Sequence, residues 1–147
     1  MRSSKLLCVA AAVLALSGCG LWPHGKTSSN DAPASQALVR SLAGIVVYAL
    51  HQPVPADAVL EVSLIDVSRQ DAPARVITKE RVSPVGASPV DFQLVYDPAD
   101  LAQGVDFAVS ARLQQGDHLL AINDERISVL GRSGEQGPVR VALKAVP

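Results

Sequence analysis

Residues 107–113 read FAVSARL, and every second side chain in this stretch prefers the interior of a protein. In an extended chain Phe107 and Leu113 point to one face, whereas Ser110 and Arg112 point to the other. Such a period of two residues is typical of a β-strand that buries one face. The stretch therefore predicts a half-buried strand.

The same period recurs on both sides of this stretch. It predicts strands within 59–64, 91–96 and 139–144, adds two at 45–50 and 75–82, and allows one or two more within 121–130. Proline, glycine and aspartate, which favour turns, separate these segments. Seven or eight short strands without a sustained helical period predict an all-β fold, a small antiparallel β-sandwich.

Two connections and one tyrosine carry more specific signals. Gly116-Asp117 suits a two-residue type II′ hairpin, because glycine adopts the positive φ of its first position. Asp97 and Pro98 are typical of an N-cap and a first helical position, so we expect one helical turn there. Tyr96 follows the alternation inward, and its hydroxyl is expected to bond to backbone.

The N-terminus has the layout of a secretory signal peptide. Arg2 and Lys5 precede an apolar run of 11 residues, 6–16, which the small residues Ser17 and Gly18 follow. The run is shorter than the roughly 18 apolar residues that a membrane-spanning helix needs. Residues 1–18 are therefore predicted to be a leader. A signal peptide without lipid and a buried core helix remain alternatives.

The tetrad Leu16-Ser17-Gly18-Cys19 resembles the lipobox of bacterial prolipoproteins. The resemblance implies cleavage between Gly18 and Cys19 and attachment of diacylglycerol and an N-acyl chain to Cys19. Each buried CH₂ contributes roughly 0.8 kcal/mol, so three chains would hold the protein on a bilayer. Gly20, where inner-membrane lipoproteins often have aspartate, implies an outer-membrane anchor with the domain facing the periplasm.

The composition changes after the lipid site. Residues 19–37 are rich in serine, proline, alanine and glycine and lack apolar periodicity, so they are predicted to form the lipidated cysteine and a flexible linker. Trp22 is either a residue at the headgroup level or an ordinary linker residue. Residues 38–147 are predicted to form the β-domain.

Charge, histidines and cysteines exclude several classes of function. Loss of Arg2 and Lys5 with the leader changes 13 basic residues to 11, against 14 acidic ones, so no basic face for nucleic acid is expected. The three histidines, His24, His51 and His118, have no histidine or cysteine partner at ligand spacing. We therefore predict no metal site and no cofactor beyond the lipid on Cys19. Cys8 would leave with the leader, so no disulfide is expected.

No motif indicates catalysis. Ser133 lacks the strand–turn–helix setting of a nucleophile elbow. Asp66, Arg69 and Asp71 cluster near a turn, where a solvated loop with weak ion pairs explains them. Asp97 and Asp100 could pair as acid and base, but helix capping explains them more simply. The chain is therefore predicted not to be an enzyme and to have no catalytic residues.

Several segments resemble one family of lipoproteins. Residues 60–69 (LEVSLIDVSR), 71–74 (DAPA), 92–99 (FQLVYDPA) and 107–112 (FAVSAR) look like YbaY-type lipoproteins. With Gly44–Tyr48 and the lipobox, the similarity covers most of 40–145. The same domain family includes YscW-type lipoproteins of type III secretion, which act as pilotins and escort secretin subunits to the outer membrane. The resemblance implies a β-sandwich, whereas most YbaY-type members have no assigned role.

Two functional hypotheses follow. The first is a non-catalytic, outer-membrane-anchored lipoprotein that binds or supports another envelope component through an apolar groove or a free strand edge. Its sharpest form is pilotin-like binding of a secretin subunit. The alternative is a small-ligand or glycan binder, which needs Tyr48 and a second ring to be exposed while Phe92 and Phe107 lie in the core. The binding residues stay undetermined at this level.

Overall fold

The computed structural model of the protein describes residues 38–132 and 137–147. The predicted leader, the cleavage and lipid sites at Gly18 and Cys19, the linker with Trp22 and His24, and Ser133 lie outside the described residues. Within these residues no helix is long and apolar enough to cross a membrane.

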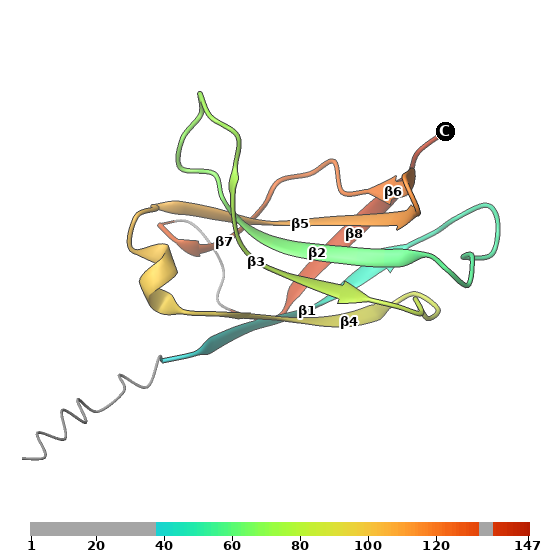
Figure 1. Cartoon of the computed structure of the whole chain (residues 1–147), viewed down its shortest axis with the longest axis horizontal. Coiled ribbons are helices and arrows are strands. Elements are labelled where there is room, and N and C mark those ends of the chain that lie inside the picture. The colour runs from blue at the N-terminus through green and yellow to red at the C-terminus, as the bar shows by residue number, and fades with distance from the viewer. Residues whose placement is uncertain (1–37, 133–136) are drawn as a thin grey trace, which may run out of the picture. The chain divides into compact units, whose positions relative to one another are not determined.

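The described residues form eight strands and one short 3₁₀ helix (Figure 1). Their bounds are β1 Arg40–Tyr48, β2 Val59–Asp66, β3 Arg75–Val82, β4 Val90–Tyr96, η1 Pro98–Leu101, β5 Asp106–Gln115, β6 His118–Ile122, β7 Ile127–Gly131 and β8 Val139–Ala145. The predicted all-β class is thereby confirmed, and the apolar segment 121–130 supplies parts of two strands rather than one.

The strands form one nearly closed sheet. Their order is β3-β2-β5-β6-β8-β1-β4, and β7 pairs with the first part of β5. The two ends of this path, β3 and β4, lie side by side without backbone pairing (Figure 1). Across this seam the Glu80 carboxylate of β3 accepts a hydrogen bond from the backbone N–H of Gln93 in β4 at 2.6 Å. These two edges thus face each other.

One strand pair departs from the predicted antiparallel arrangement. β1 and β8 run parallel, with Gly44 opposite Val139 and Tyr48 opposite Leu143. Side-chain alternation is the same in both orientations, and no short turn joins the first and last strands, so the pattern could not reveal the direction. At Gly44 a Cβ would collide with the Val139 carbonyl and the Phe92 ring. Glycine therefore permits the close approach of β8 and Phe92 to β1.

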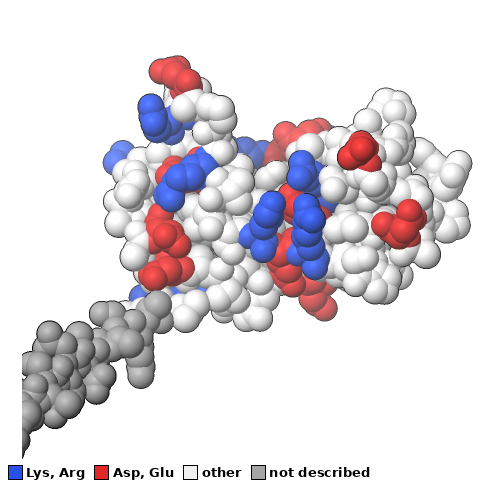
Figure 2. Space-filling view, viewed as in Figure 1, with Lys and Arg blue, Asp and Glu red and all other residues white. Residues whose placement is uncertain are grey.

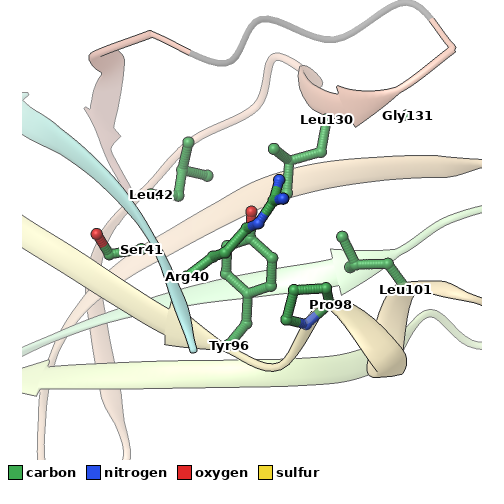
Figure 3. Close-up of a pocket in the computed structure, with 8 residues that line it drawn as sticks. All are labelled: Arg40, Ser41, Leu42, Tyr96, Pro98, Leu101, Leu130 and Gly131. Atoms are coloured by element: carbon green, nitrogen blue, oxygen red, sulfur yellow. The ribbon is translucent and has the colours of Figure 1, made fainter. Parts of the chain in front are cut away.

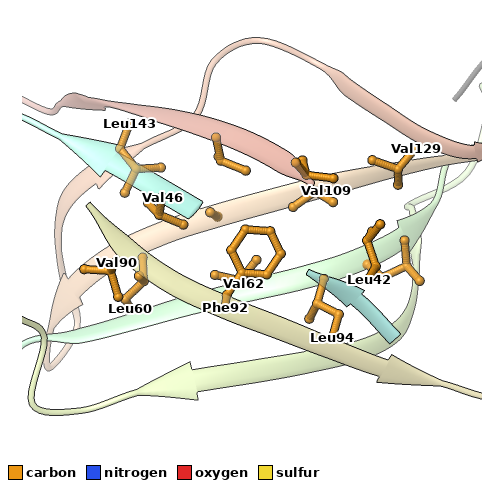
Figure 4. Packing of buried hydrophobic residues seen from close by; sticks show 14 of the residues in the cluster. Leu42, Val46, Leu60, Val62, Val90, Phe92, Leu94, Val109, Val129 and Leu143 are labelled. Carbon is orange, nitrogen blue, oxygen red and sulfur yellow. The ribbon is translucent and has the colours of Figure 1, made fainter. Parts of the chain in front are cut away.

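The core fills the inside of this sheet. Figure 4 shows the Phe92 ring among the buried aliphatic side chains of this cluster. Phe92 and Phe107 are each 3% exposed, which confirms their predicted place in the core. The largest side chains that are almost fully buried are Leu60, Leu64, Leu94, Leu113, Val46, Val62, Val109, Val129 and Val141.

The predicted turns form as expected. Gly116 has a φ of +55°. Asp117 does not have a positive φ, because Leu130 is the sole non-glycine with positive φ among the described residues. The turn is therefore of type II′ rather than type I′, which needs a positive φ at both central residues. The Asp97 carboxylate accepts a hydrogen bond from the Ala99 amide at 2.8 Å and caps η1. Local turn chemistry was therefore sufficient to predict both connections.

Candidate functional site

A pocket of about 340 Å³ opens at the end of the domain where β1 begins. It is called the Tyr96 pocket below, and Figure 3 shows its side chains. Four separate elements contribute to it: Arg40, Ser41 and Leu42 of β1, Tyr96 of β4, Pro98 and Leu101 of η1, and Leu130 and Gly131 of β7. Sequence segments that are far apart thus meet at one opening.

Tyr96 adds a hydroxyl to a pocket that Arg40 and Ser41 also make polar. The residue is 7% exposed, so the predicted inward direction of its ring is confirmed. The expected bond from its hydroxyl to backbone is not found among the hydrogen bonds within 38–132 and 137–147. The hydroxyl points instead into the pocket, towards Arg40 and Leu130 (Figure 3). It therefore offers a donor and an acceptor to an incoming group.

Leu130 forms part of the pocket wall in an unusual backbone conformation. Its φ is +52°, and that of the adjacent Gly131 is +69°. A left-handed conformation costs a non-glycine residue on the order of 1–2 kcal/mol and persists where the surroundings hold it. The wall at the end of β7 is therefore fixed by its surroundings rather than by local preference.

A polar network holds η1, which supplies Pro98 and Leu101 to the pocket. The Arg75 guanidinium donates to the backbone oxygen of Asp100 at 2.7 Å and contacts the Asp66 carboxylate at 3.3 Å. Asp66 also accepts hydrogen bonds from the Ser68 hydroxyl and amide at 2.5 and 3.0 Å. The Ser68 hydroxyl in turn accepts one from the Val105 amide at 2.8 Å. Arg75 thereby ties β3 to η1, and Ser68 ties the β2–β3 loop to the segment that follows η1.

The pKa of Asp66 reflects this network. The hydrogen bond from the Ser68 hydroxyl lowers it most, burial raises it, and the Ser68 amide and Arg75 lower it further, so that the pKa lies below its usual value. Asp66 is therefore ionised at neutral pH and stabilises the loop as a carboxylate.

The structure separates the carboxylates that were considered as catalytic candidates. Asp66 lies with Arg69 and Arg75 around a hollow of about 170 Å³, whereas Asp71 is exposed and does not line it. Asp97 caps η1, as capping predicted. Asp66 and Asp97 therefore have structural roles in the loop and at the cap.

The opposite end of the domain brings together two histidines that the sequence treats separately. His51 and His118 line one pocket of about 390 Å³, whose wall also includes Pro53, Pro55 and Val146. Within the described residues no three His, Cys, Asp or Glu side chains gather in a way that could hold a metal ion. The shared pocket arises because the β1–β2 loop and the β5–β6 hairpin meet in space.

Tyr48 does not supply the pair of exposed rings that glycan binding would need. It is half-buried, its hydroxyl donates to the Gly86 carbonyl, and burial raises its pKa. Phe92, Phe107 and Tyr96 are buried. Among the described residues no second exposed ring accompanies Tyr48.

The Tyr96 pocket combines apolar and polar surface. Leucine and proline form part of its wall, the Tyr96 hydroxyl, Arg40 and Ser41 contribute polar groups, and none of its described lining residues is a histidine, cysteine or carboxylate. The sequence indicated Tyr96 and Pro98 but not Arg40, Leu101 or Leu130. Neither a motif nor the periodicity marks these three, because they meet only when β1, η1 and β7 converge.

Comparison with known proteins agrees with this architecture. Residues 38–143 match the family described as "Type III secretion system lipoprotein chaperone (YscW)". The chain belongs to the YscW family. This YscW-family protein is also 33% identical over 124 residues to the uncharacterized lipoprotein YbaY of Escherichia coli strain K12. That match covers 82% of this chain and 64% of YbaY, so the chain spans less than two thirds of its relative.

A solved structure extends the likeness to three dimensions. The YscW-family protein is similar to an alternative pilotin from the type II secretion system of Vibrio cholerae, with a TM-score of 0.67 and 33% identity. The similarity covers 74% of this chain and 98% of the pilotin. The predicted resemblance to YbaY-type and YscW-type lipoproteins is thereby confirmed.

Proposed function

We propose that this YscW-family protein is a non-catalytic lipoprotein, anchored in the outer membrane through Cys19, whose periplasmic domain binds a secretin-type subunit as a pilotin. The similarity that covers 98% of a solved pilotin at 33% identity carries the proposal. The family match over 38–143 supports a chaperone-like role in the cell envelope.

The Tyr96 pocket is the proposed contact for the client. An amphipathic helix can place one bulky apolar side chain in such a pocket. Burial of a leucine or phenylalanine side chain stabilises a complex by about 1.5–3 kcal/mol. The Arg40 guanidinium and the Tyr96 hydroxyl can donate to the free carbonyls at a helix end. The pocket thus provides an apolar anchor and polar contacts at the same place.

The lipid on Cys19 supplies the transport step of this proposal. A client bound to the domain moves with the anchor and reaches the membrane to which the anchor is sorted. Cys19→Ser should leave the protein unacylated and outside the outer-membrane fraction, as judged by membrane fractionation and intact mass. If the Cys19→Ser variant still carried the added mass of the lipid and reached the outer membrane in normal amounts, the proposed anchor would be contradicted.

The client is testable in cells that express the full-length protein. In vivo cross-linking, affinity purification and mass spectrometry should recover a secretin-type subunit with the wild type. Leu101→Glu places a charge in the pocket wall and should reduce this recovery about tenfold or more. Val95→Glu is the matched control, because Val95 is 50% exposed on the outer face of β4. Recovery of no secretin-type subunit, or equal losses with both variants, would refute the proposal.

A further inference from the structure

We infer that the outer face of β3, β2 and β5 docks an acidic polypeptide segment of the client. The inference rests on the proposed function, because the segment belongs to the client. A hollow of about 240 Å³, called the basic groove below, runs along this face. The small side chains of Ser63 and Ser110 form its floor, and Lys79 and Arg112 form its two sides.

The basic groove is built around one buried carboxylate. The Glu61 side chain is 6% exposed and contacts Arg81 and Arg112 at 2.7 Å each, with Lys79 at 3.8 Å. Strand pairing places Glu61 opposite both arginines. Figure 2 shows basic side chains gathered beside acidic atoms on this face. The cluster therefore has three cations and one anion, which is a formal charge of +2.

The three cations keep donors for a further anion. Their side chains are 53%, 59% and 47% exposed for Lys79, Arg81 and Arg112. An arginine carries five N–H donors, and Arg81 and Arg112 each donate one hydrogen bond to the Glu61 carboxylate. Hydrogen bonds between guanidinium and carboxylate are shorter and about twice as strong as neutral ones. A second carboxylate on the solvent side of Glu61 would accept hydrogen bonds from the N–H groups of these side chains that Glu61 leaves unused.

The ionisation of Glu61 is consistent with this excess of positive charge. Burial raises the pKa of Glu61, but the hydrogen bond from Arg81 and the charges of Arg112, Lys79 and Arg81 outweigh burial and lower it overall. Glu61 is thus already a well-stabilised anion. The net positive charge that remains on the face can act on a partner.

The apolar end of the basic groove favours a polypeptide as the occupant. Ile65 and Val76 line this end, and Val76 is 53% exposed. A segment with a carboxylate followed by an aliphatic side chain matches both parts of the groove. A nucleic acid would require a more extensive basic surface than three cations around one carboxylate. An anionic lipid surface is the competing occupant that the experiment must separate.

Binding can be measured with the full-length lipidated protein in neutral detergent. The probe is a fluorescent peptide of alternating glutamate and valine, followed by anisotropy at low and high salt. The double variant Lys79→Gln with Arg112→Gln should weaken binding about tenfold or more, since two charged donors are lost. The control is Arg126→Gln with Arg140→Gln, which removes two exposed charges elsewhere and should change binding less than about threefold.

The outcomes separate the groove from the proposed function. Lys79→Glu alone should also weaken peptide binding, and it leaves both 2.7 Å contacts of Glu61 intact, so a folding defect of the double variant cannot hide the result. Equal losses in both double variants, or tight binding to phosphatidylglycerol vesicles without peptide binding, would overturn the inference. If the wild type and the groove variant recover equal amounts of secretin-type subunit in cells, the groove is refuted and the pilotin role stands. If the peptide binds through the groove but no secretin-type subunit is recovered from cells, the groove inference stands and the pilotin role is refuted.

Discussion

β2 and β4 have the same alternating sequence pattern but different outer faces. In β4 the outward residues Asp91, Gln93 and Val95 are exposed, as the alternation predicts. In β2 the corresponding Glu61 and Ser63 are only 5% and 9% exposed. The pattern alone would have placed both sets in solvent.

The difference follows from where each strand lies in the sheet. β4 is at one end of the strand path and pairs only with β1. β2 is paired on both sides, and the side chains of Lys79 and Arg112 on its neighbours extend over it. A central strand can therefore bury a carboxylate on its outer face, provided that long cationic side chains satisfy it. The comparison shows that the neighbouring strands decide whether the outer face of a strand is exposed or buried.

The largest effect is expected on the inner faces, where the two strands should behave alike. Leu64 of β2 and Leu94 of β4 are 0% and 1% exposed. Replacing either with alanine should lower the free energy of unfolding by about 2–5 kcal/mol, because each leaves a cavity. Urea denaturation measures this. A loss under roughly 0.5 kcal/mol for either variant would show that its strand does not face the core as described.

A smaller effect should separate the outer faces. Glu61→Ala removes the acceptor shared by Arg81 and Arg112 and should cost about 1–3 kcal/mol, because their charged hydrogen bonds are lost. Gln93→Ala on β4 should stay within about 0.5 kcal/mol. Chemical denaturation of both variants tests the contrast. Equal costs would mean that the burial of Glu61 has no energetic consequence.

The pH dependence of stability should sharpen the same contrast. The folded-state pKa of Glu61 is lowered, so its ionised form contributes stability above the unfolded-state pKa, and this contribution is lost as the pH falls through the folded-state value. Between neutral pH and about pH 3 the wild type should lose more unfolding free energy than Glu61→Gln. Parallel curves of free energy against pH would argue against a stabilising charge at Glu61.

The smallest effect is expected at the edge of the charged cluster. Lys79→Ala removes an exposed cation 3.8 Å from Glu61 and should cost about 0.2–1 kcal/mol, less at high salt. Thermal unfolding at two salt concentrations measures it. A cost that is larger and independent of salt would mean that Lys79 packs against the sheet rather than acting through its charge.

Most of the fold was accessible from local patterns, whereas the pocket was accessible only in part. The alternation identified the strands, and Asp97-Pro98 and Gly116-Asp117 identified two connections, because these signals act within a few residues. The Tyr96 pocket brings together Arg40, Leu101 and Leu130, although Arg40 and Leu130 are 90 positions apart in the sequence. No local pattern records such a contact, and the same holds for Glu61 between Arg81 and Arg112.

The amino-acid sequence by itself determined the all-β class, the inner faces of the strands and the family to which the chain belongs. These properties depend on the period of apolar side chains and on short motifs, which act locally. Only the tertiary structure decided the parallel pairing of β1 with β8, the meeting of four elements at Tyr96 and the burial of Glu61. Each of these depends on which strands become neighbours, and that choice is made by the packing of the whole core.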